Sequence, residues 1–194
     1  DAKPNHIASN AAAISLLIRT NKPDAAKKYL DDLKKFAPKN PQSYFLDAQL
    51  NYHLKDFKAA RESAQQLLRI APNSPDSLQI AGAIEYQLRS YLQAETYLAK
   101  ALQSAPNLLL ARRLLVASQL RSGNAAKALE TLQPVMNRID QDPALLSLAG
   151  EAYLQHGEPN KAAEFFAKAS RLEPESVAKK TSLALAHIAQ GSAE

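Results

Sequence analysis

Apolar and polar positions alternate along this chain with the period of α-helices. In the stretch 91–104, Ala94, Leu98 and Leu102 recur four residues apart, which places them on one face of a helix. The pattern predicts two sets of helices joined by short turns. The first helices are expected at 7–20, 41–54, 75–88, 109–122, 143–156 and 177–190. The second helices are expected at 23–36, 57–70, 91–104, 125–138 and 159–172.

The helices recur with a period of 34 residues. An alanine column follows this step through Ala26, Ala60, Ala94, Ala128 and Ala162. A second column keeps the same step through Pro4, Pro38, Pro72, Pro106, Asp140 and Pro174. Two columns that share one period without insertion or deletion indicate a repeat solenoid. We expect the alanine to lie where two helices cross closely, because a small side chain lets the backbones approach.

The period predicts one solenoid over residues 1–194, without an interior domain boundary. Its repeats are expected at about 7–40, 41–74, 75–108, 109–142 and 143–176, with a final lone helix at 177–190. Residues 1–4 are interpreted as the end of a preceding second helix. The last helix carries Leu183, Leu185 and Ile188 with no partner helix after it. We therefore expect a segment of a longer array, or end-to-end self-association through helix 177–190.

Caps and turns delimit the helices. Asn40, Ser74 and Asp142 are suited to cap first helices, whereas Leu108 offers no side-chain cap. The first helices end at a turn column, which reads Asn21, Lys55, Arg89, Gly123, Gly157 and Gly191. Pro134 lies inside the predicted helix 125–138, where proline removes a backbone hydrogen bond. We expect a kink or a shortened helix there.

These columns resemble the tetratricopeptide repeat. That family places an aromatic early in the first helix, a small residue four positions on, an alanine in the second helix and a proline near the end. The match reads Tyr44, Ala48, Ala60 and Pro72, then Leu78, Gly82, Ala94 and Pro106, then Leu146, Gly150, Ala162 and Pro174. The departures at the aromatic position are Asn10, Arg112 and Lys180. The resemblance implies an all-α, right-handed α-α superhelix.

A finer resemblance concerns stretches such as RRLLVASQLRSGNAAKALETLQPVM. They are similar to the tetratricopeptide lipoproteins of bacterial exosortase (PEP-CTERM) and exopolysaccharide systems, and the proline in LQPVM fits that group. The resemblance implies a periplasmic or outer-membrane-anchored protein, as one segment of a larger lipoprotein. The alternative is a cytoplasmic protein.

The residues that carry chemistry do not form an active site in the sequence. The chain has no cysteine, and its four histidines, at 6, 53, 156 and 187, are scattered. No phosphate-binding glycine cluster or nucleophile motif occurs. We expect no enzyme activity, no cofactor and no metal. The net charge of +5 is too mild to indicate nucleic acid by itself, and no apolar run reaches the roughly 20 residues of a membrane span.

The first helices are expected to line a concave groove through positions 2, 5, 9 and 13 of each repeat. Phe45 is the best anchor for a partner, and Arg113 and Arg121 are suited to bind carboxylates. An apolar column through Tyr52, Tyr86 and Leu120 is either core or part of the groove. The candidate partner-binding residues are Gln42, Phe45, Gln49, His53, Gln79, Tyr86, Gln87, Arg113, Arg121, Glu151 and Gln155.

The function predicted first is a non-catalytic protein-interaction scaffold that holds a protein or peptide in this groove. The setting implied by the finer resemblance is exopolysaccharide export or PEP-CTERM protein sorting. A cytoplasmic adaptor or co-chaperone-like module is the alternative, although the clamp of lysine, asparagine and arginine that some family members use for a chaperone's C-terminal carboxylate is absent. A helical-repeat RNA binder is the remote alternative, because the groove lacks the basic and stacking residues that RNA requires.

Overall fold

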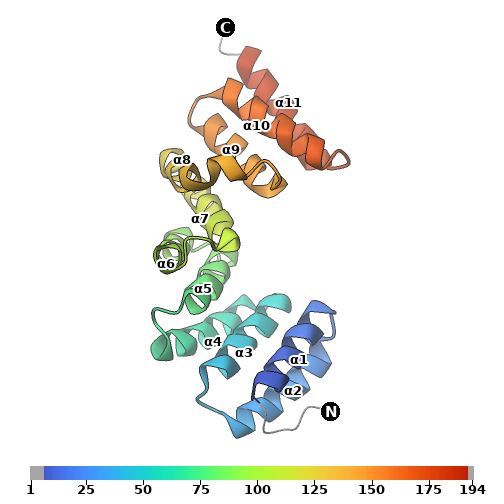
Figure 1. The fold of residues 1–194 in the computed structure, drawn as a ribbon, viewed down its shortest axis with the longest axis vertical. Coiled ribbons are helices and arrows are strands. Elements are labelled where there is room, and N and C mark those ends of the chain that lie inside the picture. The colour runs from blue at the N-terminus through green and yellow to red at the C-terminus, as the bar shows by residue number, and fades with distance from the viewer. Residues whose placement is uncertain (1–6, 192–194) are drawn as a thin grey trace. The chain divides into compact units, whose positions relative to one another are not determined.

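The structure, a computed structural model, describes residues 7–191. Among them, eleven α-helices and one 3₁₀ helix follow one another, and no strand occurs (Figure 1). The first helices are α1 (Ile7–Arg19), α3 (Pro41–His53), α5 (Pro75–Gln87), α7 (Leu109–Arg121), α9 (Pro143–Gln155) and α11 (Val177–Gly191). The second helices are α2 (Pro23–Phe36), α4 (Phe57–Ile70), α6 (Tyr91–Ser104), α8 (Ala125–Leu132) with its continuation η1 (Gln133–Arg138), and α10 (Pro159–Leu172). The predicted all-α repeat fold is confirmed.

The helices gather in two compact units, residues 1–107 and 108–194, which we call unit 1 and unit 2. The border falls between the third and fourth predicted repeats. The expectation of one uninterrupted array stays a prediction. Pro4 and the helix end expected at residues 1–4 lie outside the described residues.

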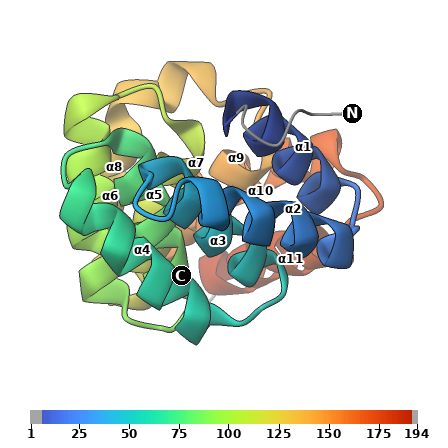
Figure 2. The same ribbon diagram turned by 90° about the horizontal axis from the view of Figure 1, so that it is seen from below.

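In unit 1 the helices pack as successive antiparallel pairs. Each first helix packs on its own second helix, as α1 does on α2, which lies beside it in Figure 2. Each first helix also contacts the next first helix, α1 with α3 and α3 with α5. The three first helices therefore form one continuous layer. In unit 2, α7, α9 and α10 make the corresponding contacts with their neighbours.

The alanine column lies where the two helices of a pair cross. All five alanines are completely buried, at 0 % exposure. A second small column faces the partner helix. A Cβ atom added at Gly82 would lie 2.4 Å from Leu98 Cγ, and one added at Gly150 would lie 2.7 Å from Phe166 Cδ1. These glycines let a large buried side chain of the second helix reach the backbone of the first helix.

The turn column adopts the left-handed backbone conformation in each of the five complete repeats. Gly123 and Gly157 have φ of +74° and +85°, as glycine readily does. Lys55 and Arg89 have φ of +61° and +60°, where a side chain with a Cβ is strained. Asn21 is the fifth member, with φ of +56°. Gly191, the sixth residue of the predicted column, is instead the last residue of α11.

The α7–α8 pair is irregular at both places that the sequence indicated. α7 begins after Leu108 without a side-chain cap, whereas Asn40, Ser74 and Asp142 cap α3, α5 and α9 through their side chains. α8 ends at Leu132, and Pro134 lies in the 3₁₀ helix that follows. The expected shortening of helix 125–138 is confirmed.

Arg112 compensates for this break. In a 3₁₀ helix, Thr131 O would accept a hydrogen bond from the N–H of residue 134, which proline lacks. Arg112 Nη1 donates to Thr131 O instead, at 2.7 Å. Arg112 is only 6 % exposed, and burial lowers the pKa of its guanidinium, with a further contribution from the charge of Arg138. An arginine at the family's aromatic position thus supports a backbone carbonyl.

Candidate partner-binding surface

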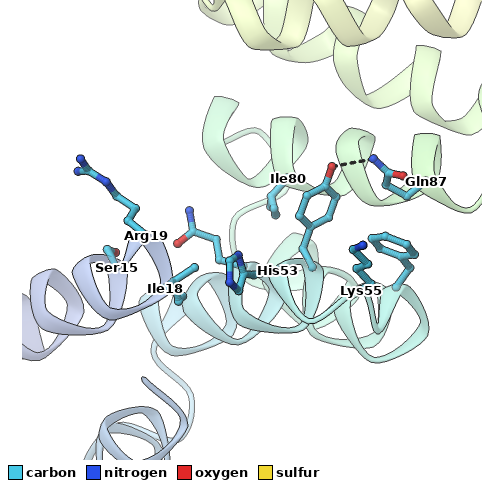
Figure 3. A pocket seen from close by; sticks show the side chains of 10 residues that line it. Ser15, Ile18, Arg19, His53, Lys55, Ile80 and Gln87 are labelled. Atoms are coloured by element: carbon cyan, nitrogen blue, oxygen red, sulfur yellow. Dashed lines mark hydrogen bonds between the residues drawn. The ribbon is translucent and has the colours of Figure 1, made fainter. Parts of the chain in front are cut away.

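A cavity of about 650 Å³ opens on the first-helix layer of unit 1. Its residues come from three successive repeats (Figure 3). They are Ser15, Ile18 and Arg19 of α1, Gln49, Tyr52 and His53 of α3, Lys55 and Phe57 around the following turn, and Ile80 and Gln87 of α5. We call it the unit 1 pocket. Its volume lies within the range of about 300 to 1,000 Å³ that is usual for ligand sites.

Tyr52 links the pocket to the core. Its ring packs against the cluster of Ala48, Ala60 and Ile84, and it meets Phe57 edge-on with ring centroids 5.5 Å apart. Its hydroxyl accepts a hydrogen bond from Gln87 Nε2 at 3.0 Å. Contacts with α4 and α5 therefore fix the position of the Tyr52 side chain. Among residues 7–191, no acceptor lies within hydrogen-bond distance for the Tyr52 hydroxyl to donate to. Tyr52 offers a bound partner a rigid aromatic wall and a donor.

His53 is also held in place. Its Nε2 donates to Asn21 Oδ1 at 3.0 Å, across two consecutive turns. Asn21 is the turn residue after α1, so this contact ties the ends of α1 and α3 together beside the pocket. The pocket is thus preformed rather than assembled from loose side chains.

Some of the residues predicted to line a groove lie together in the unit 1 pocket. Gln49, His53 and Gln87 were predicted, and all three line the unit 1 pocket. Gln42 and Phe45 line a separate cavity of about 230 Å³, together with Leu67 and Ala71. The two groups of residues therefore serve different cavities in unit 1.

Other predicted residues of unit 1 lie outside both cavities. Gln79 is half-buried, and its Oε1 has no hydrogen-bond partner among the described residues. Tyr86 is half-buried, with its ring 5.7 Å from that of Tyr91. The apolar column divides accordingly. Leu120 is core at 5 % exposure, whereas Tyr52 belongs to both core and pocket.

In unit 2 the predicted residues contact their own unit. Arg113 Nη2 donates to Asp142 Oδ2 at 2.6 Å, and Arg113 Nε donates to the same oxygen at 3.2 Å. The carboxylate that Arg113 was expected to take from a partner is therefore already supplied by Asp142. Gln155 Nε2 donates to Glu151 Oε1 at 3.2 Å. Arg121 is exposed at the end of α7.

The sequence interpretation named three of the ten residues that line the unit 1 pocket as candidates. Tyr52 was left open between core and groove, and the residues not named as candidates are Ser15, Ile18, Arg19, Lys55, Phe57 and Ile80. Lys55 carried a signal, because it is a lysine in a column where glycine is the unstrained choice. Arg19 and Phe57 carried none, since their approach to the pocket depends on how α1, α3 and α4 pack.

Two kinds of site are not found in the described part of the chain. Among residues 7–191, no three His, Asp or Glu side chains gather closely enough to hold a metal ion. Within the same range, no helix combines the length and apolar character that a membrane crossing requires.

The repeat pattern, the left-handed turns and the buried alanine column agree with one known family. Two family profiles match the sequence, both described as tetratricopeptide repeat, at residues 11–75 and 143–176. The chain belongs to the tetratricopeptide repeat family. Tetratricopeptide repeat proteins are generally non-catalytic scaffolds that bind protein or peptide partners. No curated protein matches this chain in sequence.

Solved structures share the fold at low sequence identity. PilW, a widely conserved type IV pilus biogenesis factor, is 20% identical with a TM-score of 0.83, over 95% of this chain and 86% of PilW. YrrB, a tetratricopeptide protein with an unusual peptide-binding site, is 19% identical with a TM-score of 0.74, over 89% of each chain. MamA from Desulfovibrio magneticus RS-1, from residue 41 to its end, is 19% identical with a TM-score of 0.75, over 88% of this chain and 97% of that one.

Proposed function

We propose that this tetratricopeptide protein is a non-catalytic scaffold that binds a peptide segment of a partner protein in the unit 1 pocket. The observation that carries the proposal is a cavity of about 650 Å³ to which three successive first helices contribute. A peptide that lies across α1, α3 and α5 would contact all three repeats at once. The peptide-binding site for which YrrB is described supports the same use of this fold.

The pocket has the physical features of an anchor site. Ile18, Tyr52, Phe57 and Ile80 supply apolar walls, while Gln49 and Gln87 supply amides that can bond a peptide backbone. Burial of one large apolar side chain stabilises a complex by about 1.5 to 3 kcal/mol. The pocket is therefore suited to take one such side chain from the partner.

A variant that fills the pocket tests this function. Ser15→Trp places an indole in the cavity from α1, whereas Ser104→Trp adds the same group at the exposed end of α6. Both proteins are used to capture partners from the envelope fraction of the source cell. We expect the wild type and Ser104→Trp to retain the same partner and Ser15→Trp to lose it. Equal capture by both variants, with both folded, would contradict the proposal.

We propose that the scaffold works outside the cytoplasm, in a lipoprotein linked to exopolysaccharide export or PEP-CTERM protein sorting. The similarity of RRLLVASQLRSGNAAKALETLQPVM to such lipoproteins supports this setting, as does the shared fold of PilW, a pilus biogenesis factor. Cell fractionation of the tagged full-length protein tests it. Recovery in the cytosol would favour the adaptor alternative instead.

We also propose end-to-end self-association through α11. Leu185 and Ile188 of this helix are 54 % and 65 % exposed, and Val177 is 75 % exposed. Association would cover this apolar surface. Sedimentation tests the proposal, since Leu185→Glu with Ile188→Glu should convert any dimer into a monomer. A wild type that sediments as a monomer at all concentrations would rule it out.

A further inference from the structure

The rim of the unit 1 pocket carries cations without carboxylates. Arg19 and Lys55 are among the ten residues that line it, and none of the ten is Asp or Glu. Within residues 7–191, the side chains of Arg19 and Lys55 have neither an ion pair nor a hydrogen bond. The pocket therefore presents positive charge that the described part of the protein does not neutralise.

Two other cations of unit 1, Lys34 and Arg61, are paired with half-buried or buried carboxylates. Lys34 Nζ lies 2.9 Å from Asp47 Oδ1, and Arg61 Nε lies 2.9 Å from Glu85 Oε1. Arg19 and Lys55, by contrast, line a cavity whose ten lining residues include no carboxylate. The distribution of charge favours an acidic partner.

The conformation of Lys55 is a second, independent observation. Lys55 has φ of +61°, in the column where unit 2 has Gly123 and Gly157. A left-handed residue with a Cβ costs about 1 to 2 kcal/mol relative to its usual conformation. Strained residues of this kind cluster at functional sites. Arg89 shares this conformation but lies outside the unit 1 pocket, so Lys55 is the strained cation that also lines the cavity.

The two cations lie on opposite sides of an apolar centre. Figure 3 shows Arg19 extending from α1 on one side, Lys55 after α3 on the other, and Ile80 between them. A bound segment with an apolar residue in the centre would bring its neighbouring residues to the two cations.

We infer that the unit 1 pocket selects an acidic peptide segment, in which an aliphatic or aromatic side chain enters the centre and Asp or Glu residues on either side contact Arg19 and Lys55. This inference rests on the proposed function, because it assumes that the pocket binds a peptide. The inference adds to that function the chemical character of the bound peptide. Arg19 and Lys55 determine specificity, and the apolar walls provide the anchor.

A phage-displayed library of random peptides, selected on the 194-residue chain, tests the inference. We expect the selected peptides to share one large apolar residue with Asp or Glu on both sides. The charge-reversed protein carries Arg19→Glu and Lys55→Glu. The matched control carries Lys27→Glu and Lys28→Glu, which make the same change of net charge on exposed positions of α2.

The best selected peptide is then synthesised and its affinity measured. Reversal of two rim charges should weaken binding about tenfold or more at low ionic strength, while the control changes it less than about twofold. Added salt should weaken wild-type binding and reduce the difference. A neutral double variant, Arg19→Gln with Lys55→Gln, should have an affinity between those of the wild type and the charge-reversed protein. It tests the inference even if charge reversal disturbs folding.

The remaining outcomes separate the two proposals. Selected peptides that bind in the pocket but lack acidic residues would overturn the inference and leave the proposed function intact. Peptides whose binding survives Ser15→Trp would overturn both, as would the failure to select any peptide. Binding of single-stranded RNA that the charge reversal abolishes, or a wild-type dimer that it dissociates, would also overturn the inference, because another occupant would then use these cations.

Discussion

Unit 1 and unit 2 contain the same repeat, but the cations on or directly after their first helices differ in how they are paired. In unit 2, Arg112 bonds the Thr131 carbonyl beside Pro134, and Arg113 bonds Asp142 at the start of α9. In unit 1, Arg19 and Lys55 lie at a pocket without any partner among the described residues. Charge at a groove position therefore does not by itself mark a binding site. The stronger indication is a cation at a cavity that has no partner within the fold.

The difference follows from the regularity of the helix pairs. In unit 1 the helices α2, α4 and α6 run unbroken, so their backbone carbonyls need no side-chain donor. In unit 2, the break at Pro134 leaves a carbonyl that requires one. Arg112 is thus used to bond a backbone carbonyl. We therefore expect the partner peptide to bind in unit 1.

Removal of Arg112 should have the largest effect on stability. Arg112→Ala leaves the Thr131 carbonyl without its donor and a cavity beside it, which should lower the free energy of unfolding by about 2 to 3 kcal/mol. The double variant with Pro134→Ala should lose less than the sum of the two changes, because α8 could then continue and satisfy its own carbonyls. Urea denaturation of the four proteins measures this coupling. If the two losses of stability add strictly, Arg112 does not compensate for the helix break at Pro134.

Both units share a glycine on a first helix that lies close to a large side chain of the second helix. Gly82→Ala in unit 1 places a Cβ 2.4 Å from Leu98 Cγ, and Gly150→Ala in unit 2 places one 2.7 Å from Phe166. Each should destabilise the protein by about 2 kcal/mol through overpacking. Leu98→Ala should rescue Gly82→Ala in part, because Ala48 and Ala64 occupy the equivalent positions of the preceding repeat and are both buried in one cluster. Thermal denaturation measures both effects, and unchanged midpoints would contradict the close approach.

The helices were predictable from the sequence, and most of the candidate site was not. The 34-residue period predicted ten of the eleven described α-helices to within one residue at each end, because caps and turns are local signals. The exception is α8, which ends at Leu132, and the proline that shortens it is also a local signal. The contact between Arg113 and Asp142 joins residues 29 positions apart, through the packing of α7 against α9. The pairing of a groove cation therefore depends on tertiary geometry. The same holds for Phe45, which lies in a separate cavity from His53.

The ion pair of unit 2 should have a smaller effect. Arg113→Gln removes a half-exposed guanidinium from Asp142, whose other oxygen still accepts hydrogen bonds from the N–H groups of Ala144 and Leu145. We expect a loss of about 1 kcal/mol in the free energy of unfolding. Asp142→Asn should reduce the effect of Arg113→Gln nearly to zero in a double-mutant cycle. No loss on Arg113→Gln, with binding of the selected peptide reduced, would instead assign Arg113 to recognition.

The smallest effect on stability should be a gain, from glycine substitutions in the turn column. These substitutions also distinguish a role in peptide binding from a role in folding. Lys55→Gly and Arg89→Gly each replace a left-handed residue by glycine, which should stabilise the protein by about 0.5 to 1 kcal/mol after the larger unfolded-state entropy of glycine is included. Lys55 lines the unit 1 pocket, and Arg89 does not. Both variants should therefore melt at a higher temperature, but only Lys55→Gly should weaken binding of an acidic peptide. If the two variants bind it equally well, the strain at Lys55 has no connection with recognition, and the contrast between the cations of the two units loses its functional meaning.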